Sequence, residues 1–176
     1  MTLFDQLDKH ELRELLVKCW MTHDGSWFYN CVRELGIDTA NKLNKAAIKS
    51  LSVIETQRIK KAVGLEKEKI DSFERLKDFI DNAFSVIKGD FMDFNYSFFE
   101  NNRMHWEMSK CFAYEGMKRI GVHPQYECGV LYRVSCWLNA LGINHIFKPE
   151  IDKCLLNSRK KCSGDIILNF LKKKGI

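Results

Sequence analysis

A histidine beside an aspartate, in an aromatic stretch near the N-terminus, is the first pattern with chemical potential. The stretch reads His23-Asp24-Gly25-Ser26-Trp27-Phe28. Histidine titrates near neutral pH, so His23 could bind a metal or transfer protons. His23 also shares a predicted helix face with aromatic residues such as Trp27, which is typical of a core histidine. Taken alone, this core interpretation is the stronger one.

A glutamate and an arginine three residues apart form the second candidate site. Glu55 and Arg58 lie at positions i and i+3 of a predicted helix, close enough to pair. Arg58 falls on the apolar stripe, and an arginine that points inward requires a carboxylate partner or an anionic ligand. An internal ion pair with Glu55 or Asp24 and a ligand site explain the pattern about equally well.

Cysteines concentrate in the last third of the chain, and the candidate metal ligands there are Cys111, Cys128, Cys154 and Cys162. No C-x-x-C pair occurs, and structural zinc sites usually take their ligands in tight pairs, so a zinc ribbon is disfavoured. Ligands gathered by the fold from separate loops stay open. Cys111 begins a predicted helix, and a helix N-terminus favours the thiolate, which makes it the candidate nucleophile.

Three further cysteines, Cys19, Cys31 and Cys136, lie on apolar faces and are predicted to be small core residues. Arg103, His105 and Glu107 alternate along one strand with apolar residues between them, as on any sheet with one solvent-facing side. The chain contains no P-loop, Rossmann fingerprint, H-E-x-x-H or G-x-S-x-G motif. The common nucleotide, zinc-protease and α/β-hydrolase chemistries are therefore unsupported.

Three helices are predicted to position the first two candidate sites. Apolar residues recur every three or four positions from 12 to 35, with Asp24-Gly25 expected to bend or break the run and Gly36 to end it. Asp38 or Thr39 should start a second helix that ends near Gly64. A third is expected over residues 66–88.

The second half of the chain predicts a sheet with two more helices. Residues 91–99 and the strand from 103 should form a hairpin around the turn at 100–102. Helices are expected over 110–120 and 129–141, and a short strand over 143–148. Residues 151–156 and 165–170 are expected to pair across the turn at 157–163. The predicted fold is a single α+β domain over 1–176, with a helical portion (1–88) packed against a small antiparallel sheet and two further helices (89–176).

Composition restricts the setting. The chain has 176 residues, of which 45% are hydrophobic and 29% charged, with a net charge of +5. Its lysine-rich runs carry no interleaved aromatic residues, which argues against nucleic-acid binding. Seven cysteines are an odd number for a disulfide framework, and neither a secretory leader nor an apolar run of the ~20 residues that span a bilayer is visible. A cytoplasmic protein with reduced thiols and no membrane partner is expected.

The order of these motifs resembles a family of uncharacterised bacterial and archaeal cytosolic proteins that are frequent in anaerobes. The resemblance rests on His23-Asp24-Gly25-x-Trp27-Phe28, Gly36-Ile37-x-x-Ala40, Glu55-x-x-Arg58, the hairpin leading to Cys111, Cys128-Gly129 and the late Cys162. More distantly, the chain is similar to amino-thiazoline-carboxylate hydrolases. It is similar more loosely still to ligand-binding domains related to vinyl-reductase accessory proteins and haem-nitric-oxide sensors.

This resemblance implies an α+β domain with a small-molecule pocket between the helices and an antiparallel sheet. The site positions that it implies are His23, Asp24, Trp27, Glu55, Arg58, Cys111 and Cys128. The chain departs from the family in one respect, because the cysteine-rich, proline-containing stretch near the C-terminus is reduced to Cys154 and Cys162. That departure counts against a cluster-type metal site.

The leading functional hypothesis is therefore a cytoplasmic small-molecule-binding protein, with the pocket between the N-terminal helices and the sheet. Arg58 would hold an anionic group of the ligand, and His23 would help to set the polarity. The other expected ligand-binding residues are Asp24, Trp27, Phe28 and Glu55.

Two alternatives stay open. One is a small hydrolase acting on a C–N or C–S bond, with His23 as general base and Cys111 as nucleophile, or with a divalent metal as cofactor on His23, Asp24 and Glu55. The other is a metal- or redox-responsive protein that uses Cys111, Cys128, Cys154 and Cys162. The sequence does not choose between an enzyme and a binding protein.

Overall fold

The N-terminal portion of the computed structural model, which describes residues 1–170, is a succession of helices. A short α1 (Leu3–Gln6) precedes α2 (Lys9–Leu35), where the side chains and backbone N–H groups of Asp8 and Glu11 bond each other reciprocally. α2 is one continuous helix of 27 residues, so the expected break at Asp24-Gly25 is wrong. Its intrahelical hydrogen bonds continue through the glycine, whose cost of ~1 kcal/mol a long helix tolerates.

The next two helices start at other residues than expected. α3 (Ile37–Ala62) begins directly after Gly36, whose φ of +78° suits glycine, and not at Asp38 or Thr39. α4 (Phe73–Ile87) begins seven residues later than residue 66, because Ser72 caps it. The preceding loop is held by Arg75, which pairs with Glu68 at 2.8 Å.

Four antiparallel strands form one sheet in the order β1-β2-β4-β3. The strands are β1 (Asp93–Phe99), β2 (Arg103–Lys110), β3 (Asn144–Lys148) and β4 (Cys162–Asn169). The β1–β2 hairpin is confirmed, with Asn101 and Asn102 of its turn at positive φ. The remaining helices are α5 (Phe112–Arg119), α6 (Gly129–Ala140) and α7 (Leu155–Arg159).

One predicted strand pairing is wrong. Residues 151–156 form no strand in the structure, because α7 occupies the end of this stretch. β4 pairs instead with β2 on one side and with β3 on the other. Gly164 of β4 is opposite Trp106, and a Cβ at this glycine would lie 2.6 Å from the indole ring. The glycine therefore leaves room for the Trp106 ring.

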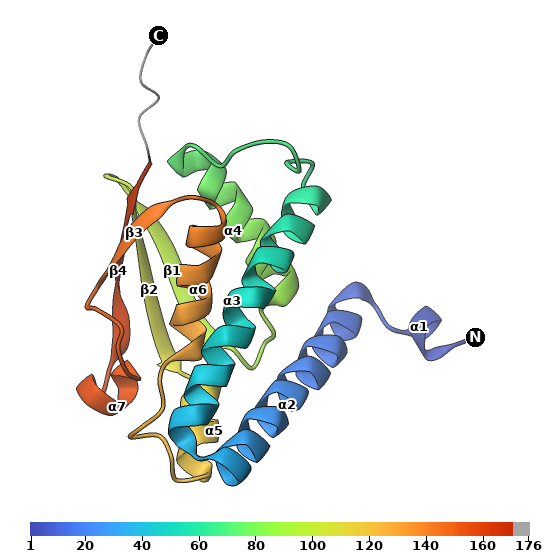
Figure 1. Ribbon diagram of the computed structural model, residues 1–176. Helices are drawn as coiled ribbons and strands as arrows, with labels where there is room; N and C mark the ends of the chain where they lie inside the picture. Colours follow the sequence, from blue (N-terminus) through green and yellow to red (C-terminus); the bar gives the residue numbers. More distant parts are fainter. Residues whose placement is uncertain (171–176) are drawn as a thin grey trace.

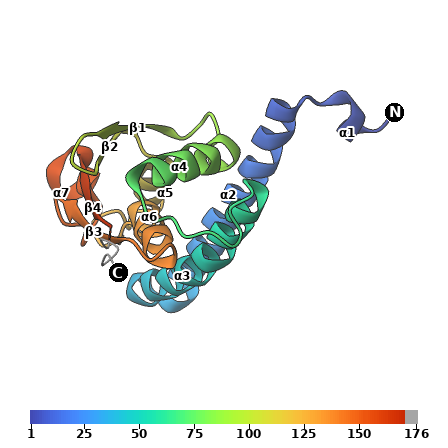
Figure 2. The same cartoon turned by 90° about the horizontal axis from the view of Figure 1, so that it is seen from above.

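Helices α2 to α6 pack on one face of the sheet in layers, whereas α7 lies apart from them at the end of the sheet (Figures 1 and 2). α4, α5 and α6 lie next to the sheet, α3 lies outside α6, and α2 is outermost. The core between the sheet and α4 and α6 contains fully buried residues such as Phe79, Trp137 and Ile166. The predicted α+β class, with N-terminal helices packed with a small antiparallel sheet, is confirmed. Within the described residues, no helix is both long and apolar enough to cross a membrane.

Candidate functional site

The buried side of α3 is polar, and this reverses one prediction. Its buried positions include Asn41, Ser52, Glu55 and Thr56, whereas Arg58 lies on the exposed side of the helix. The predicted stripe followed the larger apolar residues, which are partly solvent-facing here. The prediction that Arg58 points into a pocket is therefore wrong.

Glu55 binds an arginine that the sequence analysis did not single out. Arg133 of α6 donates Nε–H to Glu55 Oε2 at 3.0 Å and Nη2–H to Glu55 Oε1. Trp137 Nε1 donates to the same Oε2 at 2.7 Å. The side chains of Arg133 and Glu55 are only 19% and 10% exposed, so this is a buried bidentate ion pair joining α3 to α6.

Tryptophan rings enclose this ion pair. The Arg133 guanidinium lies 4.7 Å from the ring centroid of Trp20 and 5.6 Å from that of Trp137. Asp24 of α2 is also near, although its side chain is 55% exposed: partial desolvation raises its pKa above the ordinary aspartate value, and the charge of Arg133 partly offsets that rise. Asp24 and Glu55 thus both belong to one polar centre around Arg133.

The other N-terminal candidate residues, His23, Trp27 and Phe28, differ in their exposure to solvent. The His23 side chain is 78% exposed and its nearest ionic partner is Asp24, 3.8 Å away. Trp27 is also exposed, because both residues lie on the side of α2 that faces solvent. The expectation that His23 points inward is therefore wrong. Phe28 is buried, and its ring packs edge-on against Tyr126, with centroids 5.7 Å apart.

An apolar cavity of about 90 Å³ lies between the helices and the sheet; we call it the sheet cavity. α2, α4 and α6 supply one side, and β1, β2 and β4 the other. Apart from Lys88 and Arg133, no charged side chain lines it. Most of its wall is aromatic or methionine, namely Phe84, Phe94, Tyr96, Trp106, Phe112, Trp137, Met21, Met92, Met104 and Met108.

A second cavity of about 280 Å³, the helix cavity, lies among α2, α3, α5 and α6. Asp24 and Phe28, two of the expected ligand-binding residues, line it, but no strand residue does, so it is not the expected pocket between helices and sheet. The two cavities share four lining residues, Met21, Phe112, Val130 and Arg133. The Arg133 side chain therefore stands at the boundary between them.

The four cysteines predicted as metal ligands are all buried, but within the described structure no three of their sulfurs lie within 4.8 Å of one another. Cys111 and Cys154 both contribute to the electrostatic environment of Cys128 and of Cys162, and Cys154 contributes to that of Cys111. Burial raises the pKa of the Cys128 thiol to about 12 and that of Cys162 to about 11.

The position of Cys111 at a helix start was read correctly, but its consequence was not. Cys111 precedes the first residue of α5, and the N–H groups of Tyr114 and Ala113 act to lower its pKa. Burial is the larger effect and raises the pKa above the ordinary thiol value. In the described structure no hydrogen bond or ion pair joins Cys111 to His23, so the geometry gives this catalytic pair no support.

A serine–histidine pair that the sequence analysis missed joins α6 to β3. Ser135 Oγ and His145 Nε2 are 2.8 Å apart, and His145 Nδ1 lies 3.1 Å from the carbonyl oxygen of Ile143. A carbonyl accepts only from N–H, so Nδ1 carries the proton and Nε2 accepts from the serine hydroxyl. The pair lines a surface pocket of about 450 Å³ with Glu150 and Asp152.

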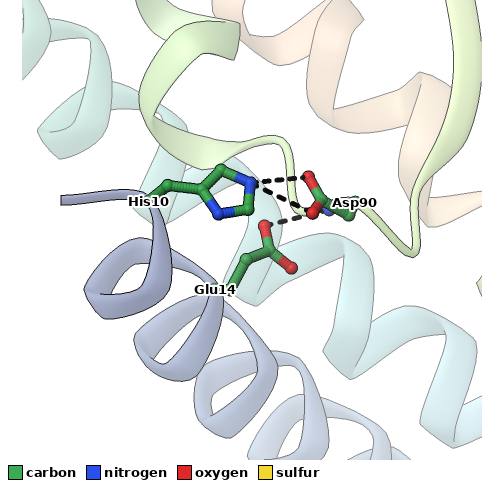
Figure 3. Close-up of side chains that lie close together, drawn as sticks. All are labelled: His10, Glu14 and Asp90. Carbon is green, nitrogen blue, oxygen red and sulfur yellow. Dashed lines mark hydrogen bonds and ion pairs between the residues drawn. The ribbon is translucent and has the colours of Figure 1, made fainter. Parts of the chain in front are cut away.

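Among the described residues, three potential metal ligands approach within 4.8 Å of one another only at His10, Glu14 and Asp90 (Figure 3). His10 Nε2 lies 3.1 Å from Asp90 Oδ2, and Asp90 N–H donates to Glu14 at 3.0 Å. Arg13 contacts both carboxylates, at 3.3 and 3.4 Å. The Arg13 guanidinium therefore already supplies a positive charge beside these two carboxylates. The contacts within this group connect α2 to the loop before β1.

Arg103, His105 and Asp165 form a partly exposed polar group on β2 and β4. Asp165 of β4 accepts from His105 at 2.9 Å and from Arg103 at 3.3 Å, both on the neighbouring strand β2. These contacts lower the pKa of Asp165, with the His105 bond as the largest cause. The interpretation of Arg103, His105 and Glu107 as a solvent-facing row is confirmed.

One feature of the sequence could have identified Arg133 as a buried, paired residue. It is the single charged residue of α6, whose other residues are apolar or small and uncharged. An isolated charge on a buried helix requires a partner. The partner, Glu55, is distant in sequence, and no local spacing rule links the two.

Comparison with known proteins identifies a family but no activity. No curated protein and no solved structure matches the chain, so the likeness to amino-thiazoline-carboxylate hydrolases and to vinyl-reductase-type domains stays a prediction. A family model does match over residues 5–162, which is most of the chain. The expected membership of an uncharacterised family is thereby confirmed: the chain belongs to DUF6125, a family of unknown function.

Proposed function

We propose that this protein binds a small, largely apolar molecule carrying an anionic or carbonyl group, with the apolar part in the sheet cavity. The supporting observation is the lining of that cavity, in which aromatic and methionine side chains surround just two charged groups, both cationic. Apolar cavities with few polar groups are the usual form of small-molecule sites. The proposed pocket lies between the helices and the sheet, as in the sequence-based hypothesis, but Lys88 and Arg133 take the role that was predicted for Arg58.

Lys88 and Arg133 are the donors that would meet the ligand's acceptor group. Lys88 Nζ donates to the Phe94 carbonyl oxygen at 2.7 Å and has further hydrogens to offer. Arg133 gives Nε–H and one Nη2–H to Glu55, which leaves other guanidinium hydrogens uncommitted to that carboxylate. Glu55 balances the charge of Arg133, whereas Lys88 forms no ion pair within the described residues, so Lys88 supplies the positive charge for the ligand.

The size of the ligand follows from the two cavities. Dry apolar cavities of roughly 150 Å³ bind benzene, so the sheet cavity at about 90 Å³ suits an alkyl chain or part of a ring. A larger ligand, including one with a whole benzene ring, would extend past Arg133 into the helix cavity, since the two share lining residues. We therefore expect a ligand with a compact apolar end.

Three probes of similar shape and different charge test the proposal: benzoate, toluene and benzylammonium. Trp106 and Trp137 line the cavity, so tryptophan fluorescence and the rise in Tm report binding. Benzoate should bind more tightly than the other two. Val134→Phe should fill the cavity and abolish binding, whereas Val86→Phe, on the exposed side of α4, is the matched control. Equal binding by Val134→Phe and the native protein would refute the site.

A hydrolase is the second candidate, and one observation favours it. Ser135, His145 and the Ile143 carbonyl oxygen have the order of nucleophile, base and orienting acceptor. Ser135→Ala and His145→Gln should then abolish hydrolysis of p-nitrophenyl acetate, with Ser158→Ala as control. Hydrolysis that is absent from the native protein, or unchanged in both variants, would eliminate this candidate.

A further inference from the structure

The side of α2 that faces away from the rest of the molecule is largely apolar. Of the 27 residues of this helix, only Glu14, Val17 and Phe28 are buried. With 3.6 residues per turn, the opposite side, which we call the outer face of α2, consists of residues 12, 15, 16, 19, 22, 23, 26, 27 and 30. All of these except Leu12 are exposed, and none is Asp, Glu, Lys or Arg. An exposed helix side usually has charged residues, so this composition is that of a contact surface.

One edge of the outer face is symmetric about the middle of the helix. Helix periodicity places residues 11, 15, 29 and 33 along this edge, and all four are exposed. Glu11 and Arg33 are equally far from position 22, on opposite sides of it, and so are Leu15 and Tyr29. The symmetry therefore matches an acid with a base and a leucine with an aromatic ring.

The other edge of the outer face has the same symmetry. It contains residues 9, 16, 27 and 34, which are also exposed. Lys9 and Glu34 are equally far from the midpoint between positions 21 and 22, and so are Leu16 and Trp27. The two edges thus share one centre to within half a residue. Each edge again matches opposite charges at the ends and a leucine with an aromatic ring nearer the middle.

A second copy of the chain, related by a two-fold axis through this centre, complements both edges at once. In an antiparallel pair of helices, the same edge of each copy faces its counterpart, and residues equally far from the axis lie opposite each other. A parallel pair would put all the aromatic rings of the two edges at one level and all the leucines at another. The antiparallel pair faces a leucine with a ring at every level, which keeps the helix separation even, and it opposes the helix dipoles. The contacts between the copies would be Glu11 with Arg33, Leu15 with Tyr29, Lys9 with Glu34 and Leu16 with Trp27.

We propose that two copies of this chain associate through the outer faces of α2, antiparallel about a two-fold axis near Met21 and Thr22. α2 is the outermost helix of the molecule, so its outer face can be reached by a second copy (Figure 1). Arg33 and Glu34 contact each other within one chain, but their side chains are 60% and 64% exposed and can take further partners. A contact through one helix is narrow compared with an obligate interface, so the two copies should associate and separate with concentration.

Sedimentation velocity of the full-length chain over a range of concentrations tests the association. The native chain should form a dimer whose fraction rises with concentration, and Leu16→Glu should leave it monomeric. Val86→Glu is the matched control, because Val86 of α4 is 61% exposed and Leu16 is 60% exposed, so neither change should affect folding. A native chain that is monomeric at every concentration, or a dimer that Leu16→Glu does not weaken, overturns the proposal.

A charge exchange tests the antiparallel direction. Glu34→Lys would place a cation against Lys9 of the second copy, twice per dimer, and should raise the dimer Kd roughly tenfold. Adding Lys9→Glu to that variant should restore the native Kd. In a parallel pair the new carboxylate at position 9 would instead meet Glu11, so the double variant would be weaker than Glu34→Lys alone. A double variant that is not restored therefore overturns the antiparallel arrangement.

A measurement on the native chain removes the dependence on variants. Cys19 lies in the middle of the outer face and is the exposed cysteine of the described structure, whereas the other six are buried or half-buried. Its rate of labelling by a thiol reagent, assigned to Cys19 by mass spectrometry, should fall as the protein concentration rises and the second copy covers the thiol. A rate that is the same in dilute and concentrated protein overturns the proposed interface.

Discussion

The ion pair between Glu55 and Arg133 should be the most sensitive contact between α3 and α6. Arg133→Met removes two charge-assisted hydrogen bonds, worth about 1.5–3 kcal/mol each, and leaves a carboxylate that is 10% exposed with Trp137 Nε1 as its remaining donor. Breaking a buried pair on one side costs about 3–5 kcal/mol. For a chain of this length, 3 kcal/mol lowers Tm by roughly 6–12 °C.

The double variant separates the ion pair from the packing. Glu55→Leu combined with Arg133→Met leaves no unpaired charge, so it should be more stable than Arg133→Met alone, with a coupling energy of at least about 2 kcal/mol. Urea unfolding of the four proteins of this cycle measures the coupling. Arg33→Met is the matched control, because its pair with Glu34 is exposed and should be worth less than about 1 kcal/mol. A coupling energy below about 0.5 kcal/mol would refute the role assigned to the pair.

Three other outcomes follow from single contacts. Asn41→Ala removes two hydrogen bonds to partly buried backbone groups of the loop before α6, each worth about 0.5–1.5 kcal/mol, and should lower the unfolding free energy in urea by about 1–3 kcal/mol; an unchanged value contradicts the contact. Gly164→Ala should cost about 1–3 kcal/mol and perturb the near-ultraviolet circular dichroism of Trp106, which a Cβ would displace. Burial, and then the hydrogen bond to Asp81, raise the pKa of Tyr96. The Tyr96 hydroxyl therefore holds its proton more tightly in the folded than in the unfolded state. Its contribution to the free energy of unfolding is complete below about pH 10, the ordinary tyrosine pKa, and decreases as the pH rises above that value. Tyr96→Phe should show the shallower alkaline decline, and equal declines would contradict the assignment.

The sheet was the more predictable half of the fold. In β2, alternation of Met104, Trp106 and Met108 with polar residues is enough to identify the strand and its buried face. The β3–β4 pairing was not predictable in the same way. Ile151 to Leu156 has an apolar content that suits a strand, yet residues from Leu155 form α7. Local composition does not distinguish a short strand from a short helix when the pairing partner is distant.

The prediction of the candidate site was wrong about the buried side of α3, for a different physical reason. On α3 the largest side chains do not mark the buried face, because Ser52 and Thr56 bond their own helix and Glu55 is paired, so polar residues are buried without penalty. The periodicity argument assumes that apolar positions are buried. It therefore assigned the wrong side of α3 to the core and predicted that Arg58 points inward. Glu55 was singled out correctly, but its partner Arg133 lies 78 residues away.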